Sequence, residues 1–151
     1  MNKNMAGAIL GLLAFTSGCA APGTVDAQAK AGGPTNTSAR CTASPCRVAI
    51  TVGAGCHVTV QPFELVIPAS LGPNVEVEWT LTTTDGWTFD PEGIRVVPPN
   101  AHFKLITRDA MKQRGKTDNT TPNERYTYHV HFRKASPQQC SYDPIMISGA
   151  A

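Results

Sequence analysis

The sequence predicts an all-β domain, a sandwich of about eight short strands, from three features. Beyond Cys41 the apolar residues recur at every second position, which is typical of half-buried strands and not of amphipathic helices. The chain has 13 glycines and 12 prolines, and because both residue types interrupt regular structure, they favour many turns over long helices. Four cysteines lie in the same region, as in small domains that disulfides stabilise.

The first half of this region predicts four strands. A strand and its hairpin partner share an apolar face, whose residues are Val48, Ile50, Val52, Val58 and Val60. Residues 53–55, with the sequence Gly-Ala-Gly, predict the turn between them. Leu65 and Ile67 mark a third short strand. The fourth strand is longer, and its apolar residues are Val75, Val77, Trp79 and Leu81.

Turn signals divide the middle of the chain. Asp85-Gly86 and the segment 90–93 (DPEG) predict two turns, which separate short strands at 87–89 and 94–97. The next predicted strand contains Phe103, Leu105 and Ile106. Residues 107–124 show no apolar periodicity, and we therefore expect a long exposed loop there.

Apolar alternation returns in the last part of the chain. One predicted strand has the inward residues Tyr126, Tyr128, Val130 and Phe132, and residues 144–147 predict a terminal strand. This layout fits a sandwich of the immunoglobulin-like or cupredoxin-like kind, with a small β-barrel as the alternative. The tryptophan strand and the segments WTFDPEGI, YTYHV and CSYDPIMI are similar to uncharacterised β-sandwich proteins secreted by proteobacteria. That resemblance implies the fold and no activity.

The N-terminus has the pattern of an export signal. Residues 1–4 are polar with one cation, Lys3, and residues 5–15 (MAGAILGLLAF) form an apolar run too short to span a bilayer of about 30 Å. Together with this run, Ser17-Gly18-Cys19 resembles the lipobox of bacterial lipoproteins. Thr16 stands where those proteins usually have an aliphatic residue.

The resemblance implies that a signal peptidase cleaves before Cys19 and that Cys19 then carries fatty acyl chains such as palmitate, which anchor the protein to a membrane. Because Ala20 is not an aspartate, the sorting pattern of these lipoproteins favours the outer membrane. The alternative is an ordinary secretory signal that is cut near Ala20 or Ala21 and releases a soluble periplasmic or secreted protein.

These patterns predict a signal peptide at residues 1–18, a flexible tether at residues 19–40 that begins with lipidated Cys19, and a β-sandwich domain at residues 41–151. The tether is made of small and polar residues, with Val25 as its only large apolar side chain, so it cannot bury enough surface to become ordered. When Lys3 is lost with the signal peptide, the net charge falls from +2 to +1, which gives no electrostatic case for a nucleic-acid partner.

The chain has an odd number of cysteines, five. If Cys19 carries lipid, Cys41, Cys46, Cys56 and Cys140 remain, and outside the cytoplasm we expect them to form two disulfides. Three pairings are open. We favour Cys41 with Cys46, which closes a tight loop, and Cys56 with Cys140, which connects an early strand to the last segment.

His129 and His131 are the strongest candidates for a metal site. Residues two apart on a strand point to the same side, so the two imidazoles could share a metal ion. Further ligands would come from Cys56, His57 and His102. The sequence lacks the late Cys, His and Met spacing of blue-copper proteins, and two arginines lie on the same strand face. We therefore favour a solvated strand face with no metal and no cofactor.

Glu76 and Glu78 raise the alternative of a hydrolase that acts on envelope polymers. Their expected separation of about 7 Å resembles that of the two carboxyl groups in inverting glycosidases. A general acid, however, needs a carboxyl group whose pKa burial has raised, and the alternation does not suggest such burial. Motifs for nucleophilic, zinc-protease, phosphate-binding or dithiol chemistry do not occur in the sequence.

We therefore expect a non-enzymatic binding or structural module, anchored to a membrane through its lipid, whose further partner is an envelope protein or polymer. The predicted loop at 107–124 carries four cations that could contact anionic lipid or envelope polyanions, and these are Arg108, Lys112, Arg114 and Lys116. The alternatives are a periplasmic metal-binding protein that uses His129 and His131, and a hydrolase that uses Glu76 or Glu78.

Overall fold

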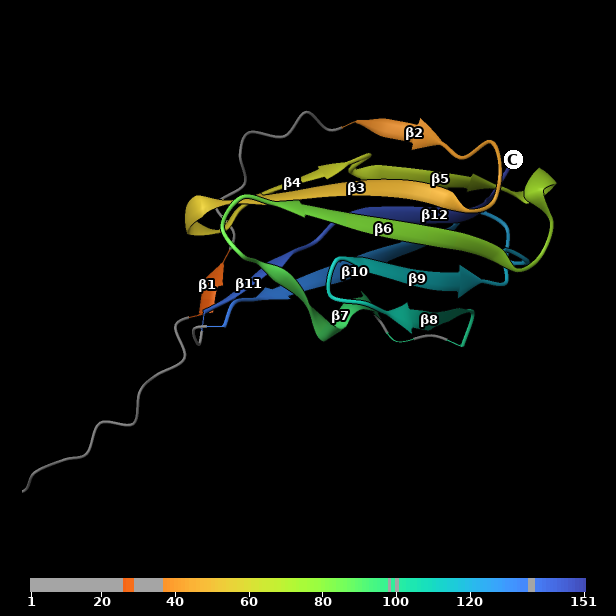
Figure 1. Ribbon diagram of the computed structural model, residues 1–151. Coiled ribbons are helices and arrows are strands. Elements are labelled where there is room, and N and C mark those ends of the chain that lie inside the picture. The colour runs from red at the N-terminus through yellow and green to blue at the C-terminus, as the bar shows by residue number, and fades with distance from the viewer. Residues whose placement is uncertain (1–25, 29–36, 98, 100, 136–137) are drawn as a thin grey trace, which may run out of the picture.

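The computed structural model describes residues 26–28, 37–97, 99, 101–135 and 138–151, which form two mixed β-sheets (Figure 1). Within these residues the only helices are two 3-10 turns, η1 (Ala54–Cys56) and η2 (Ala69–Leu71). None of the helices described is long and apolar enough to cross a membrane. The predicted all-β sandwich is confirmed, and because the sheets do not close on each other, the barrel alternative is wrong.

The five-stranded sheet forms one layer, in which β3 and β6 lie in front of β10 and β12 in Figure 1. Its strands, in order across the sheet, are β4 (His57–Gln61), β3 (Cys46–Gly53), β6 (Val75–Thr83), β9 (Lys112–Thr117) and β8 (Phe103–Arg108). β3 pairs antiparallel with β4, which confirms the predicted hairpin, and parallel with β6. β9 pairs antiparallel with both β6 and β8.

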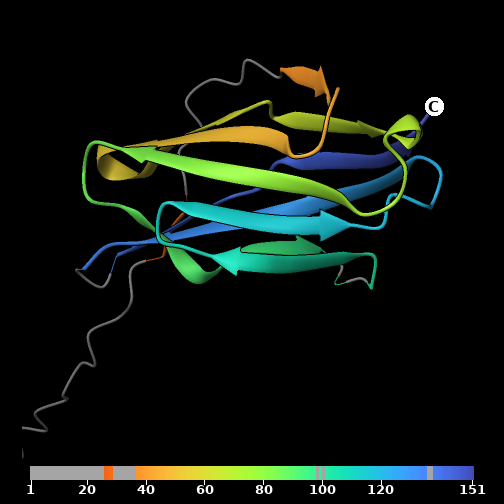
Figure 2. The same ribbon diagram turned by 45° about the vertical axis from the view of Figure 1, so that its right-hand side comes forward.

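The seven-stranded sheet is organised around β10 (Glu124–Arg133). One edge of β10 pairs with β7 (Thr88–Val97), and the other edge pairs first with β12 (Ile145–Ala150) and then with β11 (Gln139–Tyr142). Three parallel pairings complete the sheet: β5 (Glu64–Pro68) with β12, β2 (Ser38–Arg40) with β5, and β1 (Asp26–Gln28) with β11. Figure 2 shows this sheet behind the five-stranded one.

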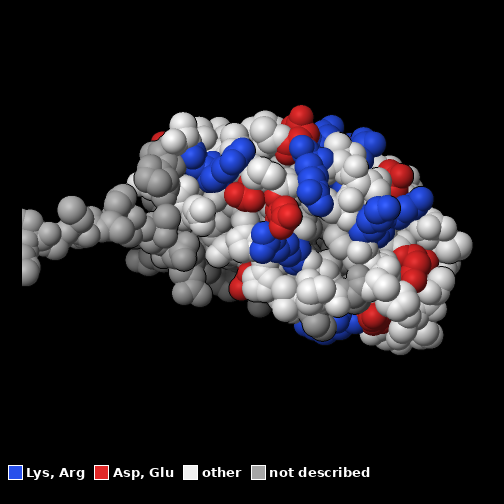
Figure 3. Space-filling model, turned by 90° about the horizontal axis from the view of Figure 1, so that it is seen from below, with Lys and Arg blue, Asp and Glu red and all other residues white. Residues whose placement is uncertain are grey.

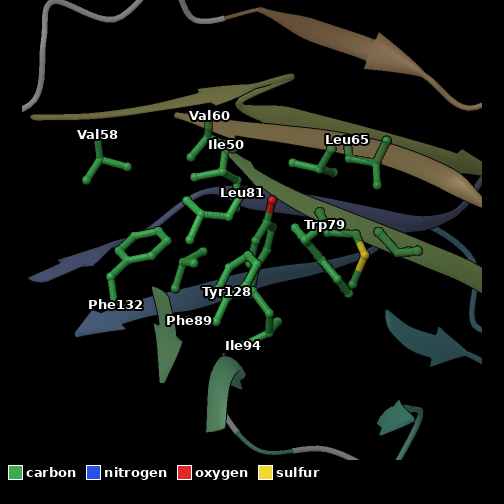
Figure 4. Packing of buried hydrophobic residues seen from close by; sticks show 14 of the residues in the cluster. Ile50, Val58, Val60, Leu65, Trp79, Leu81, Phe89, Ile94, Tyr128 and Phe132 are labelled. Atoms are coloured by element: carbon green, nitrogen blue, oxygen red, sulfur yellow. The ribbon is translucent and has the colours of Figure 1, made fainter. Parts of the chain in front are cut away.

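The core lies between the two sheets, as the alternation predicts. The inward residues of β6 and β10 are at most 3% exposed, and they are Val75, Val77, Trp79, Leu81, Tyr126, Tyr128, Val130 and Phe132. Figure 4 shows Ile50 and Leu81 of one sheet facing Tyr128 and Phe132 of the other. Full burial of such a side chain stabilises the fold by about 1.5–3 kcal/mol, so this layer provides most of the hydrophobic stabilisation.

The prediction of a long loop at residues 107–124 is wrong, because this segment contains β9, which lies between β6 and β8. The inward residues of β9 are Gln113, Gly115 and Thr117. The period of two is therefore present, but none of these residues is a large apolar one. A Cβ added to Gly115 would overlap the ring of Phe103 and touch Trp79, so aromatic rings from the neighbouring strands fill the space above this glycine.

The turn predicted at residues 90–93 is instead an irregularity within β7. Phe89 pairs with Phe132 and Ile94 pairs with Val130, so four residues of β7 lie opposite the single residue His131. The strands predicted at 87–89 and 94–97 therefore belong to one strand.

Besides β9, three further strands occur where the sequence predicts none, namely β1, β2 and β11. β1 and β2 fall within residues 19–40, where the tether is predicted. The described residues thus contain twelve strands, more than the predicted number of about eight. The predicted signal peptide, Cys19 and most of the tether lie outside the described residues.

The two favoured disulfides are confirmed. Cys41 is bonded to Cys46, with 5.5 Å between their Cα atoms, and this bond fixes the entry into β3. Cys56 of η1 is bonded to Cys140 of β11, with 5.9 Å between their Cα atoms. The second bond connects the hairpin of the five-stranded sheet to the seven-stranded sheet.

Candidate functional site

A cluster of charged side chains lies on the outer face of the five-stranded sheet. Glu78 of β6 is at its centre, and the residues opposite it on the neighbouring strands are Arg47 of β3 and Arg114 of β9. Directly opposed residues of paired strands point to the same side of a sheet, so all three side chains share this face. Glu78 itself is buried, with an exposed fraction of 6%.

Glu78 is held as a carboxylate by the basic side chains around it. Nε of Arg114 donates a hydrogen bond to Oε2 of Glu78 over 2.7 Å, and Nζ of Lys112 lies 3.8 Å from the same oxygen. The Arg114 hydrogen bond lowers the pKa of Glu78 and outweighs the burial, which acts in the opposite direction. Lys112 and Arg47 lower this pKa further.

Two more lysines extend this cluster. Lys116 of β9 lies between Glu76 of β6 and Lys104 of β8. We refer to the outward basic residues of this sheet as the basic face, and they are Arg47, Lys104, Lys112, Arg114 and Lys116. The paired positions of these described strands place two acidic residues, Glu76 and Glu78, on the same side, so the basic residues exceed the acidic ones by three.

Sequence reasoning identified part of the basic face, because it grouped Lys112, Arg114 and Lys116 as cations, but it placed them in a loop. Their spacing of two was the signal that could have identified a strand. Arg47 and Lys104 are far away in sequence and join the group only through strand pairing. Figure 3 views the molecule from the side of β7 and β8, where basic and acidic side chains lie next to each other.

The outer face of the seven-stranded sheet has a different arrangement, in which basic and acidic side chains form pairs. These pairs are Arg95 with Glu92 at 2.7 Å, Arg125 with Glu64 at 3.5 Å, and His129 with Asp143 at 2.6 Å.

Glu76 and Glu78, the residues of the hydrolase alternative, lie on the same side of β6. A general acid must hold a proton near neutral pH, and this requires a raised pKa. Arg114 lowers the pKa of Glu78 instead. This arrangement is that of a structural ion pair and is unsuited to protonating a leaving group.

His129 and His131 lie side by side on β10, with their rings stacked and the ring centroids 6.0 Å apart. Nδ1 of His129 contacts Oδ1 of Asp143, so one of its two nitrogens is already engaged. Partial burial lowers the pKa of His131, and the positive charge of Arg95 lowers it further. The two residues therefore form a partly covered pair and not an open chelate.

The other ligand candidates do not gather around this pair. Cys56 is bonded to Cys140, and Nδ1 of His102 is bound to Asp118. His57 is on β4, in the other sheet. Among the described residues, no group of three or more His, Cys, Asp or Glu side chains is arranged to hold a metal ion.

Asn119 forms a buried polar cluster that sequence reasoning missed. Its Nδ2 donates hydrogen bonds to the carbonyl oxygens of Pro68 and Gly72, each over 3.0 Å. Its Oδ1 accepts hydrogen bonds from Oγ of Ser148 at 2.9 Å and from the backbone N–H of Gly149 at 2.6 Å. Asn119 thereby joins η2 and β12 to the connection between β9 and β10.

A second group of buried polar atoms lies between the two sheets. Nε1 of Trp79, Oε1 of Gln113 and the hydroxyl of Tyr128 have no hydrogen-bond partner among the described residues. Burial raises the pKa of Tyr128. Nε2 of Gln113 does have a partner, because it donates to the carbonyl oxygen of Asp90 over 3.0 Å.

Neither the protein-family models nor the curated proteins with which the chain was compared contain a match to it.

Proposed function

We propose that this chain is an exported bacterial lipoprotein whose Cys19 is acylated and whose β-sandwich is a non-enzymatic binding or structural module at the cell envelope. The main support for this proposal is the way in which the five cysteines are distributed between disulfides and the N-terminus. Two disulfides take four of the five cysteines, and Cys19, directly after the apolar leader, is the one they leave over. Disulfides persist in oxidising compartments, which fits an exported chain.

The charged groups support a binding role more than a catalytic one. Glu78 is paired with Arg114, Asp118 with His102, and Lys134 with Asp85. Each pair joins different strands or connections, so its charges are already engaged within the fold and are not free for catalysis. The basic face, in contrast, has three more basic than acidic side chains, and such an excess of charge favours binding to anionic partners.

The test follows the N-terminus of the protein in cells. The full chain is expressed in a bacterium that is fed a labelled fatty acid, the cells are fractionated, and the mass of the N-terminal peptide is measured. We expect the protein in the membrane fraction, beginning at an acylated Cys19. The Cys19→Ser variant should lose the label and leave the membrane, whereas Thr16→Leu, which restores the common aliphatic residue, should be processed at least as well.

Two other outcomes would contradict different parts of the proposal. An unmodified chain that begins near Ala20 or Ala21 in the soluble periplasm would refute lipidation and leave export standing. An intact chain in the cytosol that still begins at Met1 would refute both.

A further inference from the structure

We propose that the basic face, together with the hairpin formed by β8 and β9, is a surface that lies on a bilayer rich in anionic lipid headgroups. This inference rests on the proposed anchoring through Cys19, because an anchored domain remains close to one membrane. It adds that the folded domain itself binds that membrane, through phosphate groups and shallow apolar contacts.

The first argument is the unequal charge of the two outer faces. The basic face has five cations for two carboxylates, and one of these carboxylates, Glu78, is already neutralised by Arg114. The side chain of Lys112 is 48% exposed and its Nζ lies 3.8 Å from Glu78, so its charged end can reach an external phosphate. Each such residue near an anionic bilayer strengthens binding about fivefold.

The second argument is the position of Lys104 and Lys116, which lie directly opposite each other on β8 and β9. Like charges at opposed positions of an antiparallel pair repel each other and destabilise the pairing. An anion that binds both ammonium groups would remove this repulsion. Lys116 has Glu76 opposite it on β6, whereas the pairings of the described strands place no carboxylate opposite Lys104.

The third argument selects a bilayer over a soluble polyanion. Ile106 on β8 and Met111 in the turn between β8 and β9 are large apolar side chains with exposed fractions of 45% and 38%. They belong to the same hairpin as Lys104, Lys112 and Lys116. Apolar side chains next to cations are typical of elements that lie in a membrane interface, where the apolar groups enter the acyl boundary. A soluble polyanion offers them no such environment.

The experiment uses the chain from Ala20 to Ala151 without lipid, which contains every described residue. Its binding is measured by co-sedimentation with vesicles of phosphatidylcholine alone and with vesicles that also contain phosphatidylglycerol. We expect binding to the second kind only, and binding that falls as salt is added. The triple variant Lys104→Gln, Lys112→Gln and Lys116→Gln should weaken it about 100-fold.

A matched control removes three charges from the other sheet, with Arg95→Gln, Arg125→Gln and Arg133→Gln. It should weaken binding by no more than about threefold, because the basic face stays intact. The apolar variant Ile106→Ser with Met111→Ser should weaken vesicle binding about tenfold, whereas Val97→Ser, an equally exposed apolar residue at the end of β7, should have little effect. Thermal unfolding of each variant checks that the fold is retained.

Three results would overturn the inference. Equal binding to both kinds of vesicle, or an equal loss in the control triple variant, would show that the basic face does not select anionic lipid. Binding to soluble dextran sulfate that needs the same three lysines, without vesicle binding, would assign the face to a soluble polyanion instead. Because these assays use chains without an acyl group, a negative result leaves the lipidation of Cys19 to its own test.

Discussion

The two groups of buried polar side chains in this domain differ in how fully they are hydrogen-bonded. All four hydrogen-bonding positions of the Asn119 amide are used. Between the sheets, polar atoms of Trp79, Gln113 and Tyr128 have no hydrogen-bond partner within the part of the chain that the structure describes. A net hydrogen bond stabilises a protein by about 1 kcal/mol, whereas a buried polar atom without a partner costs about 1–3 kcal/mol. The comparison shows that burial alone does not tell which polar residues hold a fold together.

The packing explains how the second group is tolerated. The rings of Trp79 and Tyr128 meet edge to face with centroids 5.7 Å apart, and Trp79 meets Phe103 in the same way at 5.9 Å. Aromatic pairs of this kind contribute about 0.5–1.5 kcal/mol beyond the burial of their surface. In this group the rings stabilise the core and their polar atoms weaken it.

The largest effect is expected from Asn119→Ala. This variant removes four hydrogen bonds, two of them to the carbonyl oxygens of Pro68 and Gly72, so the free energy of unfolding should fall by about 4 kcal/mol. Equilibrium unfolding in denaturant measures this change in the free energy of unfolding. The control is Asn123→Ala, because Asn123 has the same backbone angle (φ of 52°) but is exposed. An equal loss in both variants would mean that the backbone conformation, and not the amide, is responsible.

Gly115→Ala should have the next largest effect, a loss of about 2 kcal/mol, because the new methyl group would overlap the Phe103 ring and press on Trp79. Combining it with Phe103→Leu should recover part of this loss in a double-mutant cycle. Additive losses in that cycle would contradict the packing described for the second group.

Tyr128→Phe tests the second group directly. Removing a hydroxyl that has no partner should change the free energy of unfolding by less than about 1 kcal/mol, and in the stabilising direction. Tyr126→Phe is the matched control, because the Tyr126 hydroxyl donates to a carboxylate oxygen of Glu124. It should cost about 1 kcal/mol. If the two variants behaved alike, hydrogen bonding would not distinguish the two tyrosines.

The smallest effect is expected at the surface pair of His102 and Asp118. The Asp118 hydrogen bond raises the pKa of His102 above its ordinary 6.5, and His102 lowers that of Asp118 below its ordinary 3.8. The pair is therefore fully stabilising between those two values, and its contribution is lost as the pH rises through the raised pKa of His102 or falls through the lowered pKa of Asp118. His102→Gln should lower the melting temperature most in this window and least at alkaline pH. If the difference in melting temperature between His102→Gln and the unchanged protein were the same at every pH, the ion pair would not be the cause of the stabilisation.

The sandwich could be predicted because its strongest strands carry large apolar residues at every second position. Tyr126 to Phe132 and Val75 to Leu81 are such strands, and both are buried as the pattern requires. The even number of cysteines that remained after Cys19 was set aside predicted two disulfides, but the favoured pairing was one of three that the sequence left open. β9 could not be found this way, because its inward residues Gln113, Gly115 and Thr117 become core residues only when rings from other strands cover them.

The candidate site was predictable only in part, because its members come from separate strands. Arg47 and Arg114 meet Glu78 through pairings that join residues far apart in sequence, and no local pattern encodes such a register. The Asn119 cluster was missed for the same reason, since its partners are Pro68 and Gly72, which flank η2, and Ser148 and Gly149 of β12. Local alternation thus indicates which side chains are buried, but long-range pairing decides which polar groups meet.

The pairing of β1 with β11 sets how far an anchored domain could move from its membrane. Cys19 precedes Asp26 by seven positions, which is at most about 25 Å of extended chain, whereas a tether that continued to Cys41 would allow about 75 Å. β1 is only three residues long, so detaching it from β11 is a small structural change. Because β2 still pairs with β5 from Ser38 onward, this change would release the twelve positions between Asp26 and Ser38, about 40 Å of additional reach. The pairing of β1 with β11 would therefore shorten the tether of an anchored domain and keep the domain close to the lipid for as long as the two strands stay paired.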